Sequence, residues 1–499
     1  MLWRHLGLAR AWSAAGLLLG TTLLGGVGRA DEPGRAPARG GGPTVETLIR
    51  AAVEAKPKGQ ADADRAAPAP TRDADPGRVA VLDGQRSGDL QVKVRGHGAD
   101  RVKFSIRNTT DRRLRVIIPP GLVASASPLG QPGGRGGGGG GAGGAFQSMG
   151  LGAPTNRAGG FGAFTPGLTR PGTGSSPGSA AFQSVPAEDP RTADGVVVPA
   201  GKAVEFLMPS VCLNFGITTP TDDNIFTLMD VDQYTPDPRA RKALRSLATL
   251  GTSQKVAQAV MWHVYNGMTY QQLALQTVVP FNAHEMALAN RVVEALDASG
   301  PNGILDPAEL ARARVFVRVT GESSLDKGAF HLSNDLAGRA LLGLPIQVVD
   351  AKDDPASLAP ALLLHVHLTS SKPGLTKGRI AVRHATAQGS WGPLGTAQLE
   401  VPAAISDVDA DALCLAIDRA VASTFVRVAP MGRTAGVTTF RVQNRLPFTL
   451  AGLVVETAAD GKAGATTSFD ALGVGPLREG RVNIPAARGR AERVVLNGL

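Results

Sequence analysis

Histidine side chains are concentrated on two expected strands in the second half of the chain. His365 and His367 alternate in the run Leu362-Leu-Leu-His-Val-His-Leu368, so both point to one face of a strand. His384 lies on the next expected strand and could join them, and three imidazoles would suit zinc or copper. The same alternation also fits a strand whose histidines face solvent, so both interpretations stay open.

A segment between two expected helices resembles an EF-hand calcium loop. With Gly303 as the sixth position and Glu309 as the twelfth, the loop offers few carboxylates, although calcium requires oxygen ligands at fixed offsets. Asp306 directly precedes Pro307, an arrangement typical of the start of a helix. Asp306 and Glu309 are therefore candidate metal ligands, with a capped helix N-terminus as the alternative.

Cys212 and Gln258 are the sharpest candidates for chemistry. Cys212 ends an expected strand in Pro209-Ser-Val-Cys-Leu-Asn-Phe-Gly216, and Gln258 lies in the expected helix Val256-Ala-Gln-Ala-Val-Met-Trp262. An Asn266-Gly267 turn follows that helix. Together these segments resemble the thioester domains of bacterial surface adhesins.

That resemblance implies a specific reaction. In the adhesin family a strand thiol attacks a helix Gln amide, ammonia leaves, and the resulting internal thioester captures an amine of another molecule. Carried over, Cys212 would supply the sulfur, Gln258 the acyl group, and Trp262 a packing residue. Ala257 and Val260 differ from the Thr and Ala of that family. The alternative is a buried small Cys212 and a Gln258 amide on a helix surface.

A wider resemblance covers three runs of the chain. The runs 108–121, 210–216 and 257–267 look like secreted multidomain proteins of planctomycete-type bacteria. The resemblance implies export and a multidomain architecture, and it implies no activity.

Familiar enzyme motifs are missing from the sequence. The Gly-rich tract has no Gly-Lys-Ser/Thr ending, no Gly-x-Ser-x-Gly run joins an expected strand to an expected helix, and there is no His-Glu-x-x-His run. We therefore expect no enzymatic activity of a familiar class and no cofactor.

The N-terminus has the features of an export signal. Arg4 and Arg10 precede the apolar stretch Ser13–Val27, and Gly28-Arg29-Ala30 predicts cleavage after Ala30. A membrane anchor is the alternative, but the stretch is shorter than the roughly 20 residues that span a bilayer. We expect no transmembrane segment after cleavage, and a location in the periplasm, on the cell surface or outside the cell.

Composition limits the partners and the means of stabilisation. The formal net charge is +10, but aromatic residues make up only 4%, too few for a base-stacking platform, so we expect no nucleic-acid partner. The two cysteines, Cys212 and Cys414, do not form a disulfide framework. The domains must therefore be held by ordinary apolar cores.

The elements that position the candidate residues divide the chain into segments of different periodicity. Alternation predicts strands at 90–94, 102–107, 114–118 and 203–207, and the 3.6-residue period predicts helices at 239–250, after Ser253, after Thr269 and at 283–296. The expected fold class is multidomain α+β. Its expected parts are a signal peptide (1–30), a disordered tail (31–80), a β-sandwich (85–235) with a Gly-rich insertion (125–190), a helical unit (236–313), a small α+β layer domain (314–430) and a C-terminal β-module (436–499).

The sequence thus predicts an exported, non-enzymatic binding or structural protein of the cell envelope or extracellular space, with an unknown ligand. The alternative is a covalent adhesin with an internal Cys212–Gln258 thioester.

Overall fold

The computed structural model describes residues 77–126, 146–152, 181–182, 195–276, 279–300, 305–350, 354–434, 436–459 and 462–499. The signal peptide, nearly all of the tail expected over 31–80, and most of the Gly-rich tract lie outside the described residues. Across the described parts the chain is a multidomain α+β protein with several β-sheets and helices, as expected. Its helices within these ranges include none that is long and apolar enough to cross a membrane.

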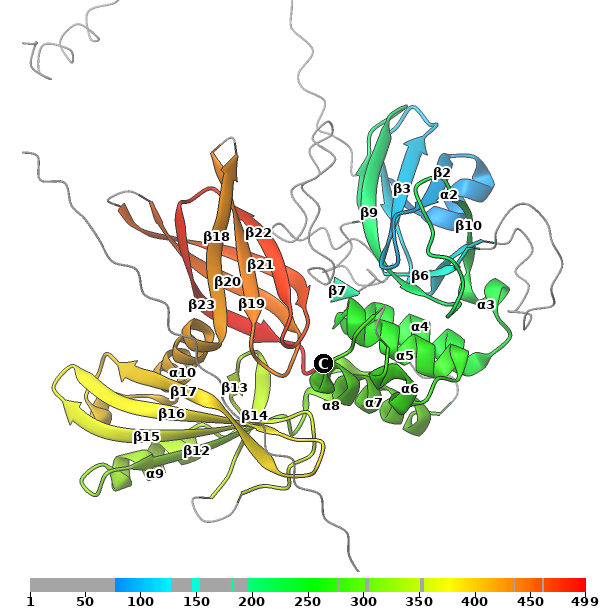
Figure 1. Cartoon of the computed structure of the whole chain (residues 1–499). Coiled ribbons are helices and arrows are strands. Elements are labelled where there is room, and N and C mark those ends of the chain that lie inside the picture. The colour runs from blue at the N-terminus through cyan, green and yellow to red at the C-terminus, as the bar shows by residue number, and fades with distance from the viewer. Residues whose placement is uncertain are drawn as a thin grey trace, which may run out of the picture. The chain divides into compact units, whose positions relative to one another are not determined.

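Six strands close into a barrel in the order β10-β2-β3-β9-β6-β5 (Figure 1). Their bounds are β2 (Leu90–Gly96), β3 (Arg101–Asn108), β5 (Leu122–Ser125), β6 (Met149–Leu151), β9 (Ala203–Cys212) and β10 (Ile225–Asp230). Alternation on β3 sends Phe104 and Ile106 into the barrel, where Phe104 stacks on Phe206 at 5.6 Å between ring centroids.

The barrel differs from the β-sandwich expected for 85–235. β10 pairs with β2 through its first residues and with β5 through its last, so one strand joins what would otherwise be two separate sheets. Local alternation is the same in a sandwich and a barrel, and therefore did not distinguish them.

A second, three-stranded sheet accompanies the barrel in the order β1-β4-β8. Its strands are β1 (Gly77–Ala80), β4 (Leu114–Ile117) and β8 (Val196–Val198), and α2 (Val81–Ser87) follows β1 directly. β1 lies in the last residues of the expected disordered tail. Its parallel pairing with β4 joins segments far apart in sequence, so composition alone does not reveal it.

Two short pieces of the Gly-rich tract belong to the fold. β6 inserts between β5 and β9, with Met149 and Leu151 fully buried, and β7 (Ala181–Phe182) pairs with β11 (Thr252–Ser253). Phe182 is fully buried as well. The sequence predicted a loop throughout 125–190 because strands of two or three residues are too short to show an alternation of apolar and polar residues, especially among glycines.

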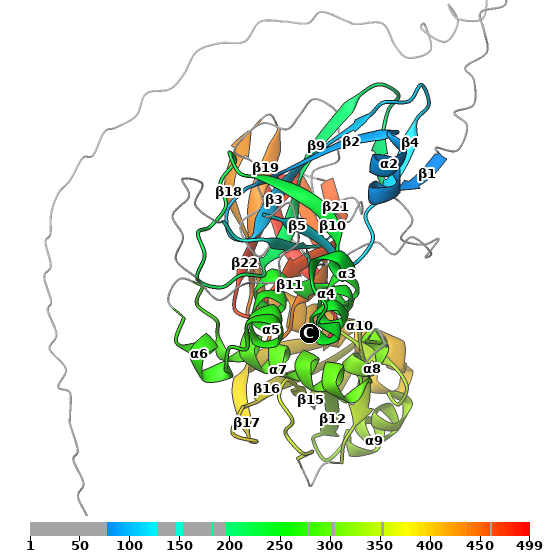
Figure 2. The same cartoon turned by 90° about the vertical axis from the view of Figure 1, so that its right-hand side faces the viewer.

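The helical unit follows the barrel. All of its helices except the first fall in the range 236–313 expected for it, and the first lies at the end of the range 85–235 expected for the β-sandwich. The helices are α3 (Val231–Tyr234), α4 (Pro238–Leu250), α5 (Gln254–Asn266), α6 (Tyr270–Ala274), α7 (Ala283–Ala298) and α8 (Pro307–Ala311). Side-chain caps at Asp237, Ser253, Thr269 and Asn282 start four of them, and left-handed Gly251 and Gly267 end α4 and α5. α5 packs against α4, α7 and strand β9, and Figure 2 shows these helices grouped together.

A six-stranded sheet in the order β13-β14-β12-β15-β16-β17 forms the next part. Its elements are β12 (Val315–Gly321), α9 (Asp326–Asp335), β13 (Ala340–Leu341), β14 (Leu344–Val348), β15 (Leu362–Lys372), β16 (Leu375–Ala385), β17 (Trp391–Val401), the short 3-10 turn η1 (Ile405–Asp407) and α10 (Ala410–Phe425). Helix α9 ends at Asp335, before Gly338, which has a positive φ, and before β13, which begins at Ala340.

The C-terminal part consists of two three-stranded sheets, β18-β19-β22 and β21-β20-β23. The strands are β18 (Val426–Thr434), β19 (Val437–Asn444), β20 (Leu450–Ala459), β21 (Lys462–Val474), β22 (Glu479–Ile484) and β23 (Arg488–Leu496). β18 begins inside the range 314–430 that we expected for the preceding domain. Its antiparallel pairing with β19 assigns it to the C-terminal part.

Candidate functional site

Cys212 is the last residue of β9, at the end where the strand becomes buried on both faces. The first half of β9 alternates between exposed and buried positions, whereas every residue from Met208 to Cys212 is buried. Continuous burial requires cover on both faces, and here α5 packs against β9 from outside the barrel. The Cys212 side chain is only 1% exposed.

Gln258 lies in the middle of α5, on a stretch of helix that is buried on all sides. Every residue from Val256 to Trp262 is buried, and Gln258 itself is 1% exposed. A helix that is apolar all round belongs in a core, so an uncharged amide at its centre requires hydrogen-bond partners. Those partners belong to Cys212.

Two hydrogen bonds hold the Gln258 carboxamide against the backbone of Cys212. The Cys212 N–H donates to Gln258 Oε1 at 2.8 Å, and Gln258 Nε2 donates to the Cys212 carbonyl oxygen at 2.9 Å. The amide carbon of Gln258 is thereby fixed beside the residue that carries the thiol. Both residues were selected from the sequence, and the fold brings them into direct contact.

Two other amide side chains of α5 also bond to the backbone in and after β9, but each makes a single hydrogen bond. Gln254 Nε2 donates to the Ser210 carbonyl at 3.0 Å, and Asn266 Nδ2 donates to the Leu213 carbonyl at 3.1 Å. These amides tie the helix to the strand through one hydrogen bond each. Gln258 makes two, both to the backbone of the cysteine Cys212.

The sulfur of Cys212 lies in an environment that opposes its ionisation overall. Burial raises the pKa of the Cys212 thiol to about 11, while contacts from the Trp262 indole and the Asn214 backbone N–H act in the opposite direction. Trp262 follows Gln258 by one turn of α5, so both side chains lie on the same face of the helix. Trp262 Nε1 is buried and has no hydrogen-bond partner among the described residues.

Aromatic rings cover this group of residues. Phe215 and Phe281 each make an edge-to-face contact with Trp262, at 4.9 Å and 5.9 Å between ring centroids. Phe215 is 42% exposed, whereas Trp262 is 5% exposed. Phe215 is therefore the more exposed member of this ring pair, and Trp262 lies buried beside it.

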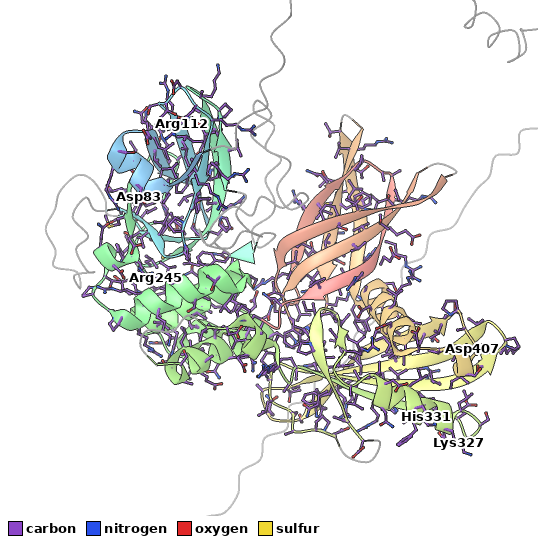
Figure 3. The ribbon with its side chains drawn as sticks, turned by 180° about the vertical axis from the view of Figure 1, so that it is seen from behind. Asp83, Arg112, Arg245, Lys327, His331 and Asp407 are labelled. Atoms are coloured by element: carbon purple, nitrogen blue, oxygen red, sulfur yellow. The ribbon has the colours of Figure 1, made fainter. Side chains whose placement is uncertain are left out.

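A charged clamp fixes the helices to the barrel end that carries the site. Arg245 of α4, labelled in Figure 3, donates to Asp230 Oδ1 at 2.9 Å and to Asp232 Oδ2 at 2.8 Å, at the junction of β10 and α3. The side-chain hydrogen bond from Arg245 lowers the pKa of Asp232. The clamp joins α4 to the barrel, and α5 packs on α4.

The histidine candidates do not form one cluster. His365 and His367 share the hydroxyl of Thr320, whose Oγ1 lies 2.8 Å from His365 Nε2 and 3.0 Å from His367 Nδ1. In the register of β15 and β16, His384 pairs with Leu362, three residues from His365, and therefore points to the opposite face of the sheet. The sequence placed the three imidazoles on successive strands but did not reveal this register.

His384 contacts a different partner. Its ring lies 5.0 Å from that of His284 on α7, measured between ring centroids. Burial is the main cause that lowers the pKa of His284 to about 4, and the nearby His384 is the second cause. No group of three His, Cys, Asp or Glu side chains arranged to hold a metal is found within the described ranges.

The EF-hand candidates have helix-capping and surface roles. Asp306 accepts a hydrogen bond from the Ala308 N–H at 2.8 Å and caps α8, with Pro307 at the first helical position. Glu309 lies 2.8 Å from Arg312 in an exposed ion pair. These contacts match the capped-turn alternative, while residues 301–304 lie outside the described residues.

Sequence reasoning missed several residues around the thiol. Asn214, Phe215 and Phe281 border the site, and none has a spacing that signals this. Asn214 follows Cys212 by two residues, and its side chain is fixed by the Ser148 N–H at 2.8 Å. A search for polar groups next to the candidate cysteine would have included Asn214, whereas Phe281 depends on tertiary packing alone.

Comparison of the chain with family models, with curated proteins and with solved structures gave no match. The chemistry of the site must therefore be argued from the geometry. A buried cysteine whose backbone is hydrogen-bonded to a buried primary amide has nearby the two groups that form a thioester with loss of ammonia.

Proposed function

We propose that this chain is an exported binding protein that attaches covalently to an amine-bearing partner through an internal thioester between Cys212 and Gln258. The observation that carries the proposal is the paired hydrogen bonding of the Gln258 carboxamide to the Cys212 backbone, at 2.8 and 2.9 Å. The resemblance of the segments around both residues to adhesin thioester domains supports it. The expected export signal fits attachment outside the cytoplasm.

The hydrogen bonds have roles in forming the thioester. When the Cys212 sulfur attacks the amide carbon of Gln258, negative charge develops on Oε1, which already accepts from the Cys212 N–H. A C–S bond forms, the C–N bond breaks, and the amide nitrogen leaves as ammonia with the proton of the thiol. Holding the two groups in contact replaces a slow encounter with an intramolecular step.

Burial has two consequences for such a thioester. Cys212 and Gln258 are each about 1% exposed, so bulk water does not reach the acyl carbon directly and hydrolysis is suppressed. An amine that enters past Phe215 attacks the acyl carbon, forms an amide with Gln258, and releases the Cys212 thiol. The product is a covalent link between the chain and its partner.

The alternative function is non-covalent binding or a structural role in the envelope, in which Gln258 only satisfies the backbone of β9. Gln254 supports this alternative, since it bonds to Ser210 one turn away with no thiol beside it. The two functions differ in whether a thioester bond joins Cys212 and Gln258. Mass spectrometry detects that bond as the loss of one ammonia.

Intact mass of the mature protein is the test. We expect wild-type protein and Cys414→Ala to be lighter than their sequences by one ammonia, and Cys212→Ala and Gln258→Ala to have full mass. Incubation with methylamine should add one methylamine to wild type, and fragmentation should place it at Gln258. If the wild-type protein has full mass and takes up no methylamine, the thioester proposal is wrong and the non-covalent function is the one that remains.

A further inference from the structure

The Trp262 indole has a polar group with no use in the resting site. The side chain is 5% exposed, and Nε1 has no hydrogen-bond partner among the described residues. An unpaired buried donor costs about 1–3 kcal/mol, so its retention calls for an explanation. Packing explains the burial of the ring but gives no use for its N–H group.

The unpaired indole lies next to the one sulfur atom that the proposed reaction uses. Trp262 is one helical turn from Gln258, which is hydrogen-bonded to the residue carrying that sulfur. The indole contacts the Cys212 thiol without forming a regular hydrogen bond to it, and this contact favours the ionised sulfur. The Asn214 backbone N–H favours the ionised sulfur in the same way.

We propose that the Trp262 Nε1–H is a catalytic hydrogen-bond donor that stabilises the Cys212 sulfur as it leaves during acyl transfer. The inference rests on the thioester proposed above. As the amine nitrogen bonds to the acyl carbon of Gln258, the C–S bond breaks and its electron pair goes to sulfur. The proton released by the attacking amine then converts the thiolate to the thiol.

The indole donor acts selectively on the transition state. A thioester sulfur is a poor acceptor, whereas a thiolate is a strong one, so the N–H···S interaction grows as the C–S bond breaks. Burial removes the solvent that would stabilise a charged sulfur, and the N–H groups of Trp262 and of the Asn214 backbone take its place. Removing one donor of this kind typically costs about 10²–10³ in rate when the acceptor is oxygen. We expect about 10- to 100-fold for the weaker acceptor sulfur.

The test compares methylamine capture by wild type, Trp262→Phe and Trp391→Phe in the full mature chain. Trp262→Phe removes the donor and keeps an aromatic ring, and we expect capture to slow about 10- to 100-fold. Trp391→Phe makes the same exchange on β17, where the indole N–H donates to the Pro355 carbonyl at 2.8 Å, so its rate should stay close to wild type. If Trp262 serves only as a cover, Trp262→Phe opens the site and speeds capture, which would overturn the proposal.

A second measurement does not require the thioester. In a Cys414→Ala, Gln258→Ala background the only thiol is that of Cys212, and NMR titration of isotopically labelled cysteine reports its pKa. Adding Trp262→Phe should raise this pKa, since the thiolate loses a donor. An unchanged or lower pKa contradicts the inference. A wild-type protein of full mass would contradict the proposed thioester. The titration would still test whether the Trp262 N–H stabilises the Cys212 thiolate.

Discussion

The two cysteines of the chain share burial but differ in what surrounds them. Cys212 and Cys414 are both buried, and burial is the main reason that the pKa of each thiol is raised to about 11. Cys212 lies against the Gln258 amide and two donors, which oppose the effect of burial. Cys414, on α10, has Asp418 and Asp411 nearby, which raise its pKa further.

The difference between these sites separates a core cysteine from a candidate nucleophile. A buried thiol is inert unless something nearby stabilises its anion and offers it an electrophile. Cys212 has both, an amide carbonyl and neighbouring N–H groups. Cys414 has neighbouring carboxylates, which repel an anion and are poor electrophiles. Cys414 therefore serves as an internal control for every experiment on Cys212.

The largest expected contrast is in alkylation after unfolding. When the protein is denatured directly into an alkylating reagent at mildly acidic pH, we expect Cys414 to be labelled and Cys212 to stay unlabelled, because a thioester sulfur has no free thiol. In Gln258→Ala both cysteines should be labelled. Peptide mapping measures each site separately, and full labelling of Cys212 in wild type would remove the contrast.

The next effect is on stability, and it isolates the hydrogen bonds from the covalent bond. In a Cys212→Ala background no thioester can form, yet the backbone partners of Gln258 remain. Adding Gln258→Ala leaves a buried N–H and a buried carbonyl unpaired, which we expect to cost about 2–4 kcal/mol in the free energy of unfolding.

Gln254→Ala is the matched control for that substitution, since it removes one hydrogen bond to the same strand, and we expect about 1–2 kcal/mol. Hydrogen exchange along β9 and α5 measures both losses locally. If the two variants lose the same free energy of unfolding, Gln258 only connects the helix to the strand, as Gln254 does.

The smallest effect concerns the carboxylate beside Cys414. Burial raises the pKa of Asp418 from 3.8 to about 6, although the Leu342 N–H donates to it at 2.7 Å. A raised folded-state pKa means that the protonated form is favoured in the fold. The stabilisation is complete below about pH 3.8 and is lost as pH rises through about 6.

Asp418→Asn should therefore stabilise the protein at neutral pH, by about 1–3 kcal/mol, and flatten the dependence of the melting temperature between those pH values. The same substitution removes a negative charge near Cys414 and should lower the pKa of that thiol, while leaving Cys212 unchanged. A melting temperature with the same pH dependence in wild type and variant would contradict this account of Asp418.

Much of the local structure could be predicted from the sequence. The caps at Ser253 and Asn282 and the stop at Gly267 fix helix ends through backbone hydrogen bonds that involve only neighbours. Alternation at 102–107 fixes a strand for the same local reason. The closed barrel, the β1–β4 pairing and the register of His384 could not be predicted, because each depends on which distant segment a strand meets.

The sequence by itself determined which side chains are candidates for chemistry and which elements hold them: a thiol at the end of a strand, and an amide one turn before an indole on a helix. Only the tertiary structure decided that α5 packs against β9, which puts the Gln258 amide on the Cys212 backbone and leaves the indole N–H without a hydrogen-bond partner among the described residues. The physical reason is that the periodicity of apolar residues depends on local backbone geometry. It predicts a helix or a strand, but it does not say which distant segment that element will pack against. The packing of the helices on the barrel determines that Gln258 meets Cys212, 46 residues away in the sequence.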